Sequence, residues 1–160
     1  MSTKTIQRPR YIRRRYEQSH TLRNRQDMES LTIDTNVLVR ILVRDDEMQY
    51  NEARKLLETY QIIVTVTVLL ETAWVLEHLY NLNPPDIINA IKGFQSLPNV
   101  EFYDNGIFSK ASSWVKNGME TADALHLAAA LTKFATFDRK FAAQAEKNRL
   151  TNVLSLSRKT

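Results

Sequence analysis

The stretch LTIDTNVLV, residues 31–39, decides the fold of this chain. Leu31, Thr32 and Ile33 are typical of a short buried strand, and the apolar run from Val37 begins a helix. Asp34 lies between them, at the end of the expected strand. A carboxylate is costly to bury unless another group pairs with it. The position of Asp34 therefore predicts a partner for it.

The rest of the chain alternates between strand and helix patterns. Strands that alternate with helices and are apolar on both sides indicate a parallel sheet covered on both faces. We predict a three-layer α/β/α sandwich with a central, mostly parallel sheet over residues 28–160, and a basic N-terminal extension over 1–27. Further strands are expected at 62–66, 100–103, 134–137 and 152–156. A helical stretch is expected after Asn36, and further helices at 48–60, 67–80, 84–97, 105–117, 122–131 (capped by Thr121) and 139–148.

The bulk composition restricts the class of protein. With 160 residues and 43% hydrophobic content, the chain is long enough for one domain with a proper core. The absence of cysteine excludes disulfides, thiolate metal sites and cysteine nucleophiles. No apolar run approaches the roughly 18–20 residues that span a bilayer, so we predict a cytoplasmic protein without a membrane segment.

The positive charge is confined to the N-terminus. Residues 1–30 contain eight Lys or Arg and three acids, whereas the remainder has a net charge of −1. Segment 1–27 has little apolar content, which is typical of disorder. Three interpretations stay open: an arm that contacts RNA phosphates, an organelle transit peptide, or an upstream extension of little consequence ahead of a start at Met28.

Four carboxylates do not fit their surroundings. Asp34 and Asp138 each follow a strand, and ligands bind beyond the carboxyl ends of parallel strands. Glu71 is expected within an apolar helical stripe with Thr67, Val68, Trp74 and Val75, and Asp123 lies in the first turn of an Ala- and Leu-rich helix. Each alone is compatible with a cap or a salt bridge. Together, converging like charges need a cation, and Mg²⁺ or Mn²⁺ takes carboxylate oxygens.

Four blocks of sequence resemble the motifs of PIN-domain ribonucleases, most closely the VapC-type toxins of bacterial toxin–antitoxin pairs. They are LTIDTNVLVRIL (31–42), VLLETAWVL (68–76), TADALHLAAAL (121–131) and FATFDRKFA (134–142). The resemblance covers residues 31–156, with the blocks in the family's order. Two features depart from the family: the short segment between Asp123 and Asp138, and the basic extension.

The resemblance implies a function and a set of site residues. Asp34, Glu71, Asp123 and Asp138 fall on the family's acidic quartet, which holds one or two Mg²⁺ or Mn²⁺ ions and hydrolyses single-stranded RNA, often a tRNA or rRNA loop. Asn36 and Thr136 fall on polar positions that orient a carboxylate or a water. Glu120 is compatible with an outer ligand, or with a solvated residue near a helix start.

The resemblance also implies partners. A small VapB-like antitoxin would place a C-terminal segment in a groove near the acids, for which the helices at 48–60 and 67–80 are our candidates, and a homodimer contact is expected elsewhere. An RNA-processing nuclease without an antitoxin and a non-catalytic RNA- or protein-binding module are the alternatives. A phosphatase with a strand-end Asp nucleophile is disfavoured because Asn36 stands where a second Asp is needed.

Several other residues are given ordinary structural roles. His126 is expected to pack within its helix, and Trp74 and Trp114 are expected in the core. Asp45 or Asp46 is expected to cap the helix at 48–60.

Overall fold

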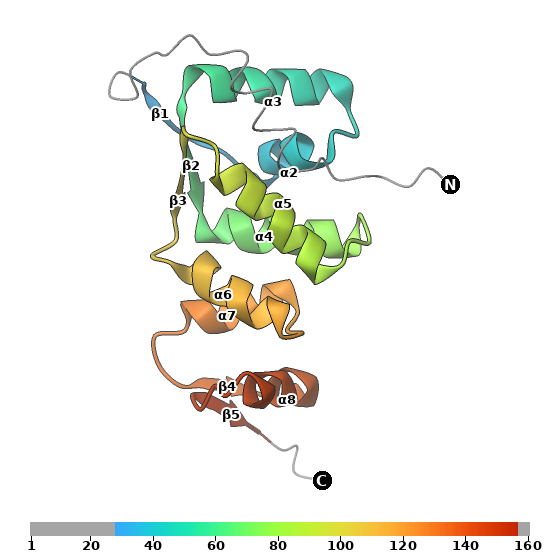
Figure 1. Cartoon of the computed structure of the whole chain (residues 1–160), viewed down its shortest axis with the longest axis vertical. Coiled ribbons are helices and arrows are strands. Elements are labelled where there is room, and N and C mark those ends of the chain that lie inside the picture. Colours follow the sequence, from blue (N-terminus) through green and yellow to red (C-terminus); the bar gives the residue numbers. More distant parts are fainter. Residues whose placement is uncertain (1–27, 157–160) are drawn as a thin grey trace. The chain divides into compact units, whose positions relative to one another are not determined.

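A computed structural model describes residues 28–156 of the chain, which divide after Asn105 into two units. The extension predicted at 1–27 lies outside the described residues. Figure 1 shows the order of the elements along the chain. Among residues 28–156, no helix is long and apolar enough to cross a membrane.

The first unit is built on three parallel strands, with β2 in the middle of the order β1-β2-β3. Leu31 pairs with Ile62, and Ile62 pairs with Val100. Ile62 and Val64 of β2 are completely buried, whereas the other three residues of the strand are only partly covered. The sequence predicts burial of both faces, and the structure gives full burial of one. The strands are β1 (Ser30–Thr32), β2 (Gln61–Thr65) and β3 (Val100–Tyr103).

Four helices lie beside this sheet (Figure 1). They are α2 (Thr35–Val43), α3 (Glu47–Thr59), α4 (Val66–His78) and α5 (Pro84–Gln95). Each contributes side chains to one core, because its apolar residues recur at helical spacing. The largest completely buried side chains of these helices are Leu38, Ile41, Leu42, Leu69, Leu76, Ile87, Ile91 and Phe94.

Local signals explain where these helices begin. The side chains of Asp34, Asp46 and Asn83 accept hydrogen bonds from backbone N–H groups in the first turns of α2, α3 and α5. Such caps satisfy N–H donors that have no partner within the helix. Pro84 stands at the first position of α5, where a missing N–H costs nothing.

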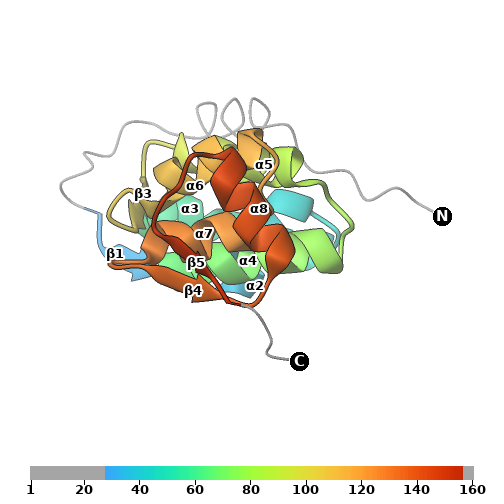
Figure 2. The same cartoon turned by 90° about the horizontal axis from the view of Figure 1, so that it is seen from below.

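The second unit contains a smaller parallel ladder. Its elements are α6 (Ile107–Lys116), α7 (Thr121–Ala129), β4 (Phe134–Thr136), α8 (Arg139–Lys147) and β5 (Val153–Ser155). Phe134 pairs with Val153, and α8 lies over the two strands (Figures 1 and 2). Phe141 of α8 stacks on Phe134 with ring centroids 4.9 Å apart. Gly118 lies in the connection between α6 and α7 with φ at +96°, a conformation that favours glycine.

The predicted α/β class with parallel strands is confirmed, and the boundaries differ in detail. The first strand ends at Thr32, two residues before Asp34. Thr121 was expected to cap α7, but this prediction is wrong: Glu120 is the N-cap residue, and Thr121 is a buried helical residue. The helix also ends at Ala129, which leaves Leu131 98% exposed.

Candidate functional site

Asp34 lies at the start of α2, where it is exposed to solvent. Its Oδ1 atom accepts a hydrogen bond of 2.9 Å from the backbone N–H of Val37. The second carboxylate oxygen takes no part in this cap. The partner that the sequence predicted for this acid is therefore, in part, the N-terminus of the helix that follows, whose dipole favours a negative charge.

Thr35 joins this helix start to the second predicted acid. Thr35 is buried, and its hydroxyl donates a 2.6 Å hydrogen bond to Oε2 of Glu71. The bond places the Glu71 carboxylate beside the N-terminus of α2, which Asp34 caps. Two of the four predicted ligands are thus brought near each other, through a residue to which we had assigned no role.

The surroundings of Glu71 differ from the prediction. The sequence suggested an apolar stripe, but Glu71, Thr67 and Trp74 are all exposed, and Trp74 is 49% exposed. The core face of α4 is instead formed by Leu69, Ala73 and Leu76 together with the buried Thr72. The predictions of a core Trp74 and of a Glu71 within the apolar face are therefore wrong. The two residues do lie on one face of the helix, but that face is the exposed one.

The second unit brings Asp123 under the influence of other carboxylates. Asp123 is half-buried in the first turn of α7. Burial raises the pKa of this carboxyl above its usual range, and the negative charges of Glu120 and Asp138 raise it further. His126 and Lys140 oppose the shift more weakly. Asp123 therefore lies within electrostatic reach of Glu120 and Asp138, while the convergence of all four predicted acids stays a prediction.

Asp138 caps α8 as Asp34 caps α2. Its Oδ1 atom accepts hydrogen bonds from the backbone N–H groups of Lys140 at 2.8 Å and Phe141 at 3.0 Å. The Thr136 hydroxyl in turn accepts the backbone N–H of Asp138 at 2.9 Å. Thr136 therefore supports the acid through its backbone, while its predicted contact with a carboxylate or a water stays a prediction.

Glu120 forms an ion pair with Lys140. The Lys140 ammonium donates a hydrogen bond to Oε1 of Glu120, and this bond holds the pKa of the Lys140 ammonium above its usual value. Lys140 is a second residue that the sequence did not single out. Its position two residues after Asp138, in the first turn of α8, was the available signal.

The donor set suits a hard divalent cation. The negative charges that raise the pKa of Asp123 would be offset by such an ion, which prefers oxygen ligands. In both caps one oxygen of the Asp remains outside the capping bonds. Among residues 28–156, however, no group of three or more His, Asp or Glu side chains is gathered closely enough to hold a metal. The assignment of Asp34, Glu71, Asp123 and Asp138 as ligands stays a prediction.

The raised pKa of Asp123 predicts a pH dependence of stability. The folded protein keeps the proton of this carboxyl to a higher pH than the unfolded chain does, so the free energy of unfolding falls as pH rises from the ordinary Asp pKa through the raised one. The Asp123→Asn variant has no carboxyl at this position, so its free energy of unfolding should not fall for this reason. In EDTA, the variant should melt a few degrees above wild type at pH 7 and converge with it near pH 3.5, since 1 kcal/mol shifts Tm by about 2–8 °C.

Thermal melts across this pH range, followed by circular dichroism, test the prediction. Asp46→Asn, which alters the cap of α3 in the other unit, serves as the matched control and should follow wild type. If the Tm of wild type and of Asp123→Asn changed equally with pH, the raised pKa of Asp123 would not be the cause of the pH dependence.

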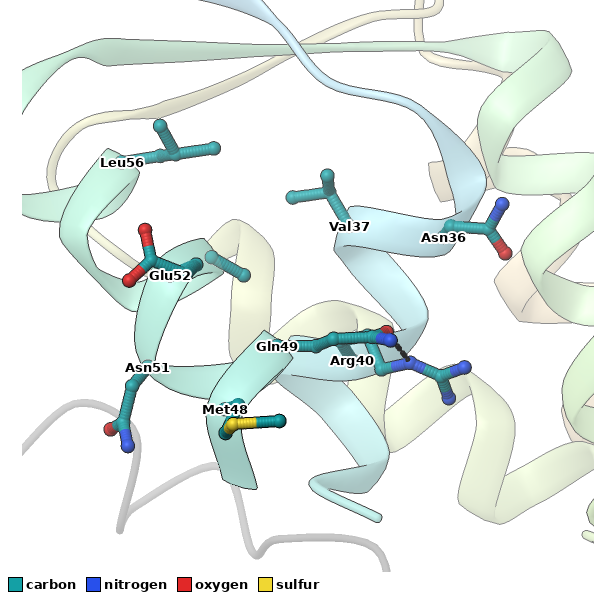
Figure 3. Close-up of a pocket in the computed structure, with 9 residues that line it drawn as sticks. Asn36, Val37, Arg40, Met48, Gln49, Asn51, Glu52 and Leu56 are labelled. Atoms are coloured by element: carbon teal, nitrogen blue, oxygen red, sulfur yellow. Dashed lines mark hydrogen bonds between the residues drawn. The ribbon is translucent and has the colours of Figure 1, made fainter. Parts of the chain in front are cut away.

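A groove opens between α2 and α3 in the first unit (Figure 3). Its volume is about 730 Å³, and its lining is mainly apolar with Arg40 on the α2 side. The Arg40 guanidinium donates to Oε1 of Gln49 at 2.6 Å and forms an ion pair with Asp45 at 2.7 Å. Tyr80 donates to the same Asp45 carboxylate at 2.8 Å. The groove is lined by Asn36, Val37, Arg40, Met48, Gln49, Asn51, Glu52, Ala53 and Leu56.

The helix expected at 48–60 lines this groove together with α2. The prediction that the helices at 48–60 and 67–80 form the antitoxin groove stays a prediction. Asn36 lies on the α2 wall, so its predicted role beside a carboxylate stays untested. The prediction that Asp45 or Asp46 caps α3 is confirmed for Asp46, while His126 is exposed and the expectation that it packs within the helix is wrong.

Comparison with protein families supports the resemblance seen in the sequence. The family model of the PIN domain matches residues 31–147, which is most of the chain. No curated protein and no solved structure matches it. PIN domains are in general metal-dependent nucleases that act on RNA. The matched range includes the starts of α2 and α8 and the helices that carry Glu71 and Asp123, and the chain belongs to the PIN-domain family.

Proposed function

We propose that this protein is a cytoplasmic endoribonuclease that hydrolyses phosphodiester bonds in tRNA or rRNA and acts as the toxin of a VapC-like toxin–antitoxin pair. The observation that carries the nuclease assignment is the Thr35–Glu71 hydrogen bond, which joins the second acid to the helix start capped by Asp34. In the second unit, the raised pKa of Asp123 beside Glu120 and Asp138 supports a cation site of the same kind.

In this proposal Asp34, Glu71, Asp123 and Asp138 hold Mg²⁺ or Mn²⁺. When bound, such ions activate water and neutralise charge on the phosphodiester. The protein's own contribution is to position the carboxylates. Thr35 fixes the Glu71 carboxylate, and two helix N-termini fix one oxygen each of Asp34 and Asp138. The Lys140 ammonium is hydrogen-bonded to Glu120. In this proposal Glu120 acts as an outer ligand when the metal ion displaces that ammonium.

Cleavage of RNA by the purified protein tests this function. Total tRNA and rRNA should be cut in Mg²⁺ or Mn²⁺ and left intact in EDTA, and mapping of the new ends would identify the substrate. Cleavage that persists in EDTA would contradict a metal-dependent nuclease. RNA left intact in both metals, with protein shown to be free of a co-purified inhibitor, would favour a non-catalytic module on the same fold.

We further propose that a small antitoxin binds the α2–α3 groove. Its volume and its mostly apolar lining suit an apolar peptide segment laid between two helices. Arg40 is fixed at the groove wall by Gln49 and Asp45, so a polar end of the segment would meet a pre-positioned cation. A homodimer contact elsewhere on the first unit belongs to the same proposal.

A charge in the groove should abolish antitoxin binding. Met48 lines the groove and is 79% exposed, so Met48→Glu should fold normally yet place a buried charge in the complex. Co-expression with the protein of a short neighbouring reading frame, followed by affinity purification, should recover the pair with wild type and lose it, by about a hundredfold or more in Kd, with Met48→Glu.

Leu79→Glu provides the matched control, because Leu79 is similarly exposed at the end of α4 and outside the groove. Equal recovery with both variants would place the partner elsewhere. Absence of any such reading frame, together with metal-dependent cleavage, would favour an RNA-processing nuclease without an antitoxin.

A further inference from the structure

The exposed residues of α4 form one continuous stripe. Thr67, Glu71, Trp74 and His78 are exposed, and every other residue of the helix is buried or half-buried. Spacings of three and four residues place all four on one face. At 1.5 Å per residue, the stripe is about 16 Å long. The surface that α4 presents therefore consists of a hydroxyl, a carboxylate and two aromatic rings.

The two rings are held in a fixed arrangement. The indole of Trp74 and the imidazole of His78 stack with centroids 4.7 Å apart and an interplanar angle of 15°. His78 Nδ1 donates a hydrogen bond of 3.0 Å to the backbone carbonyl of Trp74, and this bond restricts rotation of the imidazole. A preorganised ring pair loses little conformational freedom when a further ring stacks on it. Nearly half of the Trp74 surface is nevertheless exposed.

We propose that Trp74 and His78 form a stacking platform for a base of the RNA substrate, one helical turn from the Glu71 carboxylate. The inference rests on the proposed nuclease function. Cβ atoms three residues apart on a helix are about 5–6 Å apart, so the Trp74 ring lies one helical turn from the Glu71 carboxylate. A strand whose backbone passes Glu71 thus has a neighbouring base within reach of the rings.

The chemistry of the stripe favours nucleic acid over a protein helix. A partner helix needs a contiguous apolar face, whereas half of this stripe is polar: the Thr67 hydroxyl and the Glu71 carboxylate lie at one end and the two rings at the other. A nucleotide chain carries a polar backbone beside flat aromatic bases, which suits a surface with one polar end and one aromatic end. Stacking tolerates any base because every base has a π-face, so the platform should add affinity without strong sequence preference.

Binding to two matched oligomers tests the platform in the full-length Asp34→Asn background, which prevents cleavage. The probes are fluorescein-labelled decauridylate and a decamer with the same phosphates in which abasic spacers replace the nucleosides. Trp74→Ala should weaken decauridylate binding about 5- to 150-fold and leave binding of the abasic decamer unchanged. Trp74→Phe should retain part of the affinity, and Leu79→Ala, at the exposed C-cap of the same helix, should have no effect.

A second readout is independent of cleavage and of folding defects. Trp114→Phe leaves Trp74 as the single tryptophan of the chain, and decauridylate should then quench its fluorescence. Equal affinities for Trp74→Ala and its parent, or no quenching, would overturn the platform even if wild type cleaves RNA. Quenching by a protein that cleaves no RNA would contradict the nuclease proposal alone. A lower molar mass of Trp74→Ala by light scattering would assign the stripe to self-association and overturn the inference.

Discussion

Asp34→Asn should reduce metal-dependent RNA cleavage by at least about a hundredfold while leaving the fold intact. Loss of an outer-shell partner of a metal typically costs 10–100-fold, and a direct ligand should cost no less. Asn is as good a helix N-cap as Asp, so the bond to the Val37 N–H is retained and only the charge is lost. Initial rates on the mapped RNA, with Tm measured in parallel, test this result.

Asp46→Asn is the matched control for this experiment. Asp46 caps α3 through a 3.0 Å bond from the Gln49 N–H, in the same unit and with the same geometry. Its replacement should leave the cleavage rate unchanged. A similar loss in both variants would indicate a general charge or stability effect and would contradict a metal role for Asp34.

Asp138 offers a separate test of the same distinction. Asp138→Asn keeps an acceptor for the N–H groups of Lys140 and Phe141 but removes the charge, whereas Asp138→Ala also removes the cap at a cost of about 1 kcal/mol. Both variants should lose cleavage equally, and only Asp138→Ala should melt at a lower temperature.

The second large effect concerns the core of the first unit. Phe94 of α5 is completely buried, so Phe94→Ala removes its packing and leaves a cavity. Such replacements lower the free energy of unfolding by about 3–5 kcal/mol, which is a large share of the 5–15 kcal/mol of a typical domain. Urea denaturation followed by circular dichroism should show the loss as a lower midpoint.

Met48→Ala is the control for this prediction, since Met48 is 79% exposed. Its free energy of unfolding should stay within about 0.5 kcal/mol of wild type. A small effect of Phe94→Ala would mean that the core around α5 repacks around the missing ring or contributes little to folding.

Features that depend on neighbouring residues could be predicted from the sequence. The alternation of strands and helices, the proline start of α5 and the cap at Asp46 depend on residues close together in the chain, and their positions were predicted to within a few residues. The four acids could likewise be picked out because each interrupts an apolar pattern or follows a strand. The range matched by the family model contains all four acids, and their role in a site stays a prediction.

The tertiary structure decided which face of each helix is buried and which side chains meet. The periodicity of α4 is nearly apolar all round, so it could not show that Thr67, Glu71, Trp74 and His78 form the exposed face. The Thr35–Glu71 bond joins residues 36 positions apart. By itself, the sequence determined the elements and the family of this protein, and it singled out four acids as candidates. Only packing between distant segments determined the exposed rings beside Glu71 and the α2–α3 groove, because contacts between elements depend on their arrangement in space.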